Sequence, residues 1–169
     1  GVCGEEIFRD IYKKYETRLK ENRLIDFDDM LSYTYELFKE RPDILALWQN
    51  KYKYILIDEF QDINRLQYEI IKMLAAPQNN LFIVGDDDQS IYRFRGSKPE
   101  IMLGFEKDYP DAKRILLDTN YRCGRYIMEA SLNLISHNRE RFDKKIIAAS
   151  KSKAPVTFAD FENRRDENI

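Results

Sequence analysis

The sequence predicts an α/β fold, in which a partial parallel sheet with flanking helices follows a helical segment. Two short β-branched and aromatic runs, at residues 54–57 and 81–84, have the continuous hydrophobicity of strands covered on both faces. A helical pattern separates them, and this order is typical of parallel strands joined by a crossover helix. Residues 5–50 show only helical periodicity.

The helical segment is expected to contain two main helices. Apolar and aromatic residues recur at helical spacing over residues 7–19, which predicts the first. Asp26 can cap the second, and Pro42 ends it, because a residue that precedes proline is disfavoured in helical geometry. A short segment follows at residues 44–48. The inner face of the second helix is expected to carry Phe27, Met30, Leu31, Leu37 and Phe38.

The later elements follow the same alternation. A helical pattern at residues 64–75 leads through a turn at 77–80 to the second strand, and a third strand is predicted at 114–117. Residues 124–138 form another amphipathic helix, and a further strand is expected to begin within 156–161. We therefore expect three parallel strands with helices between them.

Composition excludes several classes of protein. The 169 residues contain 28 Lys plus Arg against 30 Asp plus Glu, so a strongly basic nucleic-acid wrapper is excluded, although a local basic groove is not. Cys3, Cys123 and His137 are too few for a Cys/His zinc site. The apolar runs are short and the first residues lack a signal-peptide pattern, so we expect a cytoplasmic protein with no membrane partner.

Polar clusters follow each predicted strand. Asp58-Glu59 follows the first, residues 85–90 follow the second, and residues 118–122 follow the third. Ligands of open parallel sheets bind beyond the carboxyl ends of the strands. If the sheet is parallel, the three clusters converge on one edge.

Asp58-Glu59 after an apolar strand fits a Walker B element. The aspartate would hold Mg²⁺, usually through water, and the glutamate would take a proton from an attacking water. The alternative is that Asp58 caps the next turn and Glu59 is merely solvated, and this pair of residues alone leaves both interpretations open.

The longer string narrows the choice. Asp58-Glu-Phe-Gln-Asp62, then residues 85–97 (Gly-Asp-Asp-Asp-Gln-Ser-Ile-Tyr-Arg-Phe-Arg-Gly-Ser), then Asn120-Tyr-Arg-Cys123 closely resemble motifs II, III and IV of superfamily 1 helicases of the UvrD/Rep/PcrA type. The resemblance extends over residues 5–150, and the combination is far more specific than any single motif. It implies a P-loop NTPase fold of the RecA-like kind.

The resemblance also implies site residues. Asp58 is similar to the aspartate that holds Mg²⁺, and Glu59 to the general base that activates water. Gln89 resembles the glutamine that senses the γ-phosphate of ATP and links it to the DNA site. Tyr121 resembles the tyrosine that stacks on adenine, and Arg122 the arginine that reaches the γ-phosphate.

By the same resemblance, Tyr92, Phe94 and Arg95 would face single-stranded DNA. Aromatic rings stack on bases without reading sequence. The family commonly has tryptophan where Phe94 stands, so stacking should survive with a smaller ring. The alternative is that Tyr92 and Phe94 are core aromatics. Arg95 can pair with a phosphate or with an acidic neighbour such as Asp62.

The Walker A loop has no counterpart in the sequence. None of the six glycines is followed by lysine, and the family's motifs V and VI are also missing. We therefore expect an internal fragment that is inactive by itself and has the remainder of the same polypeptide as a partner. The resemblance implies that the whole protein is a 3′-to-5′ DNA helicase whose other partner is single-stranded or partly duplex DNA. Residues 1–50 would end a helical subdomain, 51–122 belong to the first RecA-like domain, and 123–169 begin the second.

Two alternatives stay open. A metal-dependent nuclease would need clustered carboxylates, for which the sequence offers Asp58, Glu59, Asp86, Asp87 and Asp88. A non-catalytic, helicase-like binding module is the other. For the helicase, ATP is the expected substrate and Mg²⁺ the cofactor.

Overall fold

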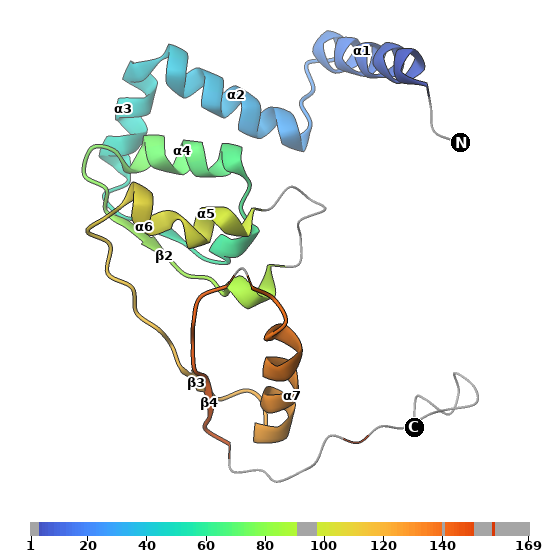
Figure 1. Ribbon diagram of the computed structural model, residues 1–169. Helices are drawn as coiled ribbons and strands as arrows, with labels where there is room; N and C mark the ends of the chain where they lie inside the picture. Colours follow the sequence, from blue (N-terminus) through green and yellow to red (C-terminus); the bar gives the residue numbers. More distant parts are fainter. Residues whose placement is uncertain (1–3, 91–97, 140, 151–156, 158–169) are drawn as a thin grey trace. The chain divides into compact units, whose positions relative to one another are not determined.

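The computed structural model describes residues 4–90, 98–139, 141–150 and 157 (Figure 1). The chain forms two compact units, residues 1–102 and residues 103–169. Each unit is described by itself below.

The first unit begins with three helices. These are α1 (Glu5–Glu21), α2 (Phe27–Glu40) and α3 (Pro42–Lys51). The predicted cap of α2 is confirmed: Asp26 Oδ1 accepts from the Asp29 backbone N–H at 2.9 Å, and Asp29 Oδ2 accepts from the Asp26 N–H at 3.2 Å. Proline at the first position of α3 suits a helix start, because its missing N–H would have no intrahelical partner there.

The predicted inner face of α2 is only partly buried. Phe38 is 6% exposed, whereas Phe27 is 86% exposed, so its expected burial is wrong. Helix α3 and helix α4 (Arg65–Ala75) pack against α2, and the only α2 residue that becomes buried is Phe38, near its C-terminal end. Phe27 is the first residue of the helix, at the opposite end, where periodicity alone does not supply a covering surface.

Strands β1 (Ile55–Ile57) and β2 (Leu81–Ile83) pair in parallel, with Ile55 opposite Leu81 and Ile57 opposite Ile83. Helix α4 (Arg65–Ala75) connects them along the chain, as predicted. Its start is fixed by a reciprocal cap: Asn64 Oδ1 accepts from the Gln67 N–H, and Gln67 Oε1 accepts from the Asn64 N–H.

The prediction that both faces of these strands are covered is wrong for this chain. Ile55 and Ile57 are half-buried, but Leu56 between them is 69% exposed, and its partner Phe82 is 57% exposed. Alternate strand residues point to opposite faces, so one face is packed and the other is open. Hydrophobicity indicates what a residue tends to bury and does not ensure that a covering layer is present.

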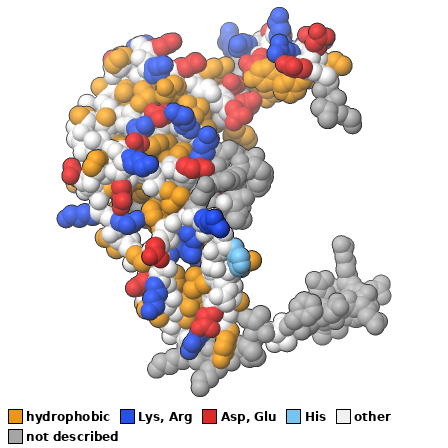
Figure 2. Space-filling view, in the orientation of Figure 1, with side chains coloured by type: hydrophobic (Ala, Val, Ile, Leu, Met, Phe, Trp, Pro, Cys, Tyr) orange, Lys and Arg blue, Asp and Glu red, His pale blue; other side chains and the backbone are white. Residues whose placement is uncertain are grey.

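Surface hydrophobic residues also line α1, which contains no buried residue. Figure 2 shows them gathered along one side of this helix, with charged side chains on the other. The exposed side chains are Ile7, Phe8, Ile11, Tyr12 and Tyr15. Within the described part of the chain, no helix is long and apolar enough to cross a membrane.

The second unit contains α6 (Phe105–Asp108), β3 (Thr119–Asn120), α7 (Arg125–Ile135) and β4 (Ile147–Ala148), and α5 (Pro99–Leu103) spans the boundary between the units. β3 and β4 pair in parallel, and α7, whose Met128 is buried, packs against β4.

The third predicted strand is wrong in position and in partner. Residues 114–117 are not a strand, and Ile115 and Leu117 are 78% and 80% exposed. The strand falls instead at β3, which pairs with β4 in a second sheet rather than with β1 or β2. A hydrophobic run becomes a strand only where a neighbour completes its hydrogen-bond ladder. The strand expected within 156–161 lies outside the described residues, except for position 157.

Candidate functional site

The chain reverses sharply at the carboxyl end of β1. Asp58 follows the strand, and Glu59 adopts the left-handed conformation (φ 50°, ψ 41°), which is unfavourable for a residue other than glycine. Phe60 anchors this turn, because its side chain is fully buried and its N–H donates to the Val84 oxygen at 2.9 Å. The turn leaves the Asp58 and Glu59 side chains exposed at the sheet edge.

A second turn lies at the carboxyl end of β2. Residues Asp87–Gln89 form a 3₁₀ turn that Asp86 caps. Asp86 Oδ1 accepts from the Asp88 N–H at 3.2 Å, and Asp86 Oδ2 accepts from the Gln89 side-chain amide at 2.8 Å. The loop from 86 to 89 is called the sensor loop below, after the role expected for Gln89. It is closed by these side-chain hydrogen bonds and by the backbone bond from the Gln89 N–H to the Asp86 carbonyl at 2.9 Å.

Gln61 joins the two turns, and the sequence-based reasoning assigned it no role. Its side chain is buried, at 1% exposed. Nε2 donates to Glu59 Oε2 at 2.7 Å, and Oε1 accepts from the Asp86 N–H at 3.0 Å. The signal was present, because Gln61 is part of the string 58–62, but the sequence did not indicate that this side chain is buried. It lies directly after the backbone reversal at Glu59.

Gly85 permits the approach of the two turns. A Cβ built on it would lie 2.7 Å from Gln61 Oε1 and 3.2 Å from both the Gln61 backbone nitrogen and Met102 Sδ. Separations this short require neighbouring atoms to move. The structure thus brings three predicted site residues, Asp58, Glu59 and Gln89, to one edge of the first sheet, close to Gly85.

Asp58 offers a carboxylate oxygen of the kind that binds a magnesium ion. Its Oδ1 accepts from the Glu59 N–H at 2.9 Å, whereas Oδ2 has no hydrogen-bond partner among the described residues. Mg²⁺ in phosphate-transfer sites is commonly bound through one or two carboxylates, with waters and substrate phosphates completing the shell. A single exposed carboxylate oxygen fits that role.

The carboxylates do not gather as a two-metal nuclease requires. In residues 4–90, 98–139 and 141–150, no three His, Cys, Asp or Glu side chains are placed to hold one metal ion. Asp86 instead caps its own turn, and Asp87 is buried at 5% exposed. The geometry therefore gives the nuclease interpretation no support.

Tyr121 and Arg122 belong to the second unit, directly after β3. Asn120 Oδ1 accepts from the N–H groups of Arg122 and Cys123, both at 2.9 Å, which fixes the turn. The side chains of Tyr121 and Arg122 are exposed, that of Tyr121 to 82%. The predicted convergence of this third cluster with the first two remains a prediction.

The predicted DNA-contacting residues Tyr92, Phe94 and Arg95 lie outside the described residues. Asp62, the acidic neighbour suggested for Arg95, has a buried Oδ1 that accepts no hydrogen bond in the described part of the chain. The suggested pairing of Arg95 with Asp62 stays a prediction.

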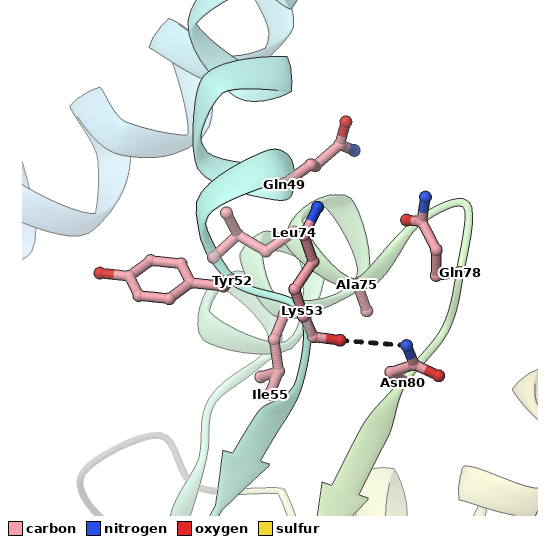
Figure 3. Close-up of a pocket in the computed structure, with 8 residues that line it drawn as sticks. All are labelled: Gln49, Tyr52, Lys53, Ile55, Leu74, Ala75, Gln78 and Asn80. Atoms are coloured by element: carbon pink, nitrogen blue, oxygen red, sulfur yellow. Dashed lines mark hydrogen bonds between the residues drawn. The ribbon is translucent and has the colours of Figure 1, made fainter.

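A hollow lies at the other, amino end of the same two strands (Figure 3). Asn80 precedes β2, and Lys53 lies shortly before β1. The side-chain amide of Asn80 donates a hydrogen bond to the Lys53 carbonyl at 3.0 Å. The hollow is lined mainly by amides and apolar side chains, so it lacks the carboxylates of the opposite edge. Its lining comprises Gln49, Tyr52, Lys53, Ile55, Leu74, Ala75, Gln78 and Asn80.

Comparisons with known proteins identify similar chains. Residues 4–110 match the UvrD/REP helicase N-terminal domain. A putative ATP-dependent DNA helicase, YjcD of Bacillus subtilis, is 48% identical over 166 residues, which is 98% of this chain and 22% of that protein. The ATP-dependent DNA helicase PcrA of Leuconostoc citreum is 39% identical, over 96% of this chain and 22% of its own length. The PcrA of Staphylococcus epidermidis is 42% identical, over 93% and 22%. The chain therefore spans about a fifth of the length of these relatives.

Proposed function

Since the chain belongs to the UvrD/REP helicase family, we propose that it is part of an ATP-dependent DNA helicase that moves 3′ to 5′ on single-stranded DNA and separates strands. The relatives' names as ATP-dependent DNA helicases support this. The observation that carries the proposal is the meeting of the Asp58-Glu59 turn with the sensor loop at the carboxyl edge of a parallel sheet.

In this proposal Glu59 is the general base. Its carboxylate is exposed at the sheet edge and can accept a proton from a water aligned on the γ-phosphate of ATP. Asp58 would hold Mg²⁺ through its Oδ2, and the bound ion would neutralise charge that develops on the phosphates. The two residues are adjacent in the chain, and the left-handed backbone at Glu59 lets them serve different partners.

Gln89 is the proposed sensor of the γ-phosphate. Its exposed amide is held by Asp86, and an amide can both donate to a phosphate and accept from water. Tyr121 would stack on the adenine base, and Arg122 would reach the γ-phosphate. Tyr92, Phe94 and Arg95, which follow the sensor loop in the sequence, would bind single-stranded DNA.

The proposal assigns residues 51–122 to a first RecA-like domain, 123–169 to the start of a second, and 1–50 to the end of a helical subdomain. The phosphate-binding lysine loop would come from the remainder of the polypeptide. The 169 residues alone then lack half the phosphate cradle, and without fixed phosphates the general base has no aligned water to act upon.

The test compares ATP hydrolysis by the full-length protein and by these 169 residues. We expect the full-length protein to hydrolyse ATP faster when single-stranded DNA is added, and the 169 residues to show no turnover above background. Turnover by the 169 residues alone would contradict the fragment proposal. A full-length protein that binds DNA without hydrolysing ATP would support a non-catalytic binding module instead.

A further inference from the structure

We propose that Gln61 is a positioning residue, which holds the general base Glu59 and the sensor loop in one hydrogen-bonded arrangement. The inference depends on the function proposed above for Glu59, and it concerns a residue outside the set of site residues predicted from the sequence. Gln61 touches neither the phosphates nor the water in this proposal, because its side chain is buried beneath the site.

The orientation of the Gln61 amide follows from its partners. The Asp86 backbone N–H can only donate, so it must face the amide oxygen, at 3.0 Å. The nitrogen then faces Glu59 Oε2, at 2.7 Å, and an ionised carboxylate can only accept. Exchanging the amide oxygen and nitrogen would place two oxygens opposite each other at Glu59 and two N–H donors opposite each other at Asp86, so only one orientation satisfies the two partners.

Burial makes this bridge selective. At 1% exposed, the Gln61 amide is shielded from water, so an arrangement that breaks either contact leaves a buried polar group unpaired. The backbone of Gln61 is tied to the residue that follows the sensor loop, since its carbonyl accepts from the Ser90 hydroxyl at 3.4 Å. The native positions of the Glu59 turn and the sensor loop are therefore favoured together.

Glu59 needs such a constraint more than an ordinary strand-end residue does. Its own side chain is exposed, so packing restricts its rotamers little. Its backbone already holds a left-handed conformation, and a carboxylate that samples several rotamers spends less time aligned on water. The short hydrogen bond from Gln61 selects one of these rotamers.

The bridge continues to the proposed sensor. Asp86, whose N–H meets Gln61, accepts through its side chain from the Gln89 amide at 2.8 Å. A path of hydrogen bonds thus runs from the Glu59 carboxylate through Gln61 and Asp86 to Gln89, entirely within the first unit. The position of the sensor amide and that of the base are therefore mechanically linked.

The test is a double-mutant cycle in the full-length protein, with saturating single-stranded DNA. Gln61→Met keeps the side-chain length and removes both hydrogen bonds. We expect kcat for ATP to fall about tenfold to a hundredfold, while the KM for ATP changes by less than about threefold, because Gln61 does not contact ATP. Adding Gln61→Met to Glu59→Gln should lower kcat no further, because the base through which Gln61 acts is already gone.

Gln49→Met is the matched control. Gln49 is a half-buried glutamine of the first unit, and its amide donates to the Met73 carbonyl at 2.8 Å, away from the two turns. We expect this variant to lose some thermal stability and to keep the wild-type kcat. If Gln61→Met fails to fold, Gln61→Asn replaces it, since its amide is too short to reach both partners.

The outcomes separate the two proposals. If Glu59→Gln hydrolyses ATP at the wild-type rate, the general-base role is wrong. If Glu59→Gln is impaired but Gln61→Met keeps the wild-type kcat, the positioning role alone is wrong. A double variant that loses kcat by the product of the two single losses would likewise overturn it, because a merely structural effect multiplies with the loss of the base.

Discussion

The two ends of the β1–β2 sheet use the same chemical group for different purposes. At the amino end, the Asn80 side-chain amide donates to the Lys53 carbonyl and so ties one backbone segment to another. At the carboxyl end, the buried Gln61 amide ties the backbone of Asp86 to the Glu59 carboxylate. The first arrangement supports the fold, whereas the second also holds the carboxylate of the proposed general base at the surface.

The first prediction concerns the Glu59 carboxylate at the carboxyl end of the sheet. In the full-length protein, Glu59→Gln should lower ATP hydrolysis about a thousandfold, within the range contributed by a general base. Nucleotide affinity, measured by fluorescence titration, should stay within about threefold, because the amide keeps the size of the side chain. Glu69→Gln on α4, whose carboxylate pairs with Lys72 at 2.9 Å, is the matched control and should hydrolyse ATP normally.

The second prediction tests the anchor beneath the carboxyl end. Phe60 is fully buried and packs edge-to-face on Tyr68, with ring centroids 5.8 Å apart. Phe60→Ala should lower the free energy of unfolding by about 3–5 kcal/mol, as measured by urea denaturation. Phe82→Ala, on the open face of the sheet at 57% exposed, should cost far less. Equal losses would mean that the open face is covered in solution.

Gly85→Ala should act on both stability and activity. The added methyl would meet Gln61 Oε1 at 2.7 Å, so we expect about 1–3 kcal/mol of lost stability and a fall in ATP hydrolysis. Gly4→Ala provides the control, because a Cβ there meets no atom within 4 Å. Wild-type hydrolysis by Gly85→Ala would show that the two turns tolerate separation.

The amino end should respond in stability alone. Asn80→Ala removes the hydrogen bond to Lys53 and should lower the free energy of unfolding by about 1 kcal/mol. ATP hydrolysis at a temperature well below the unfolding transition should be unchanged. A specific fall in kcat would contradict the division of roles between the two ends.

The smallest effect is expected outside the sheet, at the start of α2. Hydrogen bonds from the Asp29 N–H and the Tyr15 hydroxyl hold the pKa of Asp26 below its ordinary value. The carboxylate therefore stabilises the fold fully above its unfolded pKa, and this contribution is lost as the pH falls through the lower, folded pKa. The melting temperatures of wild type and Asp26→Asn should differ most near neutral pH and converge in acid. A constant difference would contradict this.

Patterns in the sequence predicted the caps and helices that local interactions determine, and the order of elements predicted how the first two strands pair. The Asp26 cap, helix α4 and the parallel pairing of β1 with β2 were predicted in this way. Burial was predicted less well, because it depends on what covers a residue: Leu56 and Phe27 are apolar but exposed. The strand expected at 114–117 failed for a related reason, since a strand needs a partner.

Part of the candidate site followed from the same reasoning, because carboxyl ends of parallel strands lie together, and Asp58, Glu59 and Gln89 do meet at one edge. The connection between them did not. A glutamine among acidic residues is expected to be solvated, whereas the structure buries Gln61 directly after the left-handed turn at Glu59.

At that turn, the residue that best fits the backbone differs from the residue that the proposed reaction needs. Glycine is the residue that a positive φ favours, so Glu59→Gly would relax the backbone at this point. The same substitution would delete the carboxylate on which the proposed hydrolysis depends. A substitution at position 59 that relieves backbone strain would therefore remove the proposed activity. Searches for thermostable variants of such proteins should leave this position unchanged.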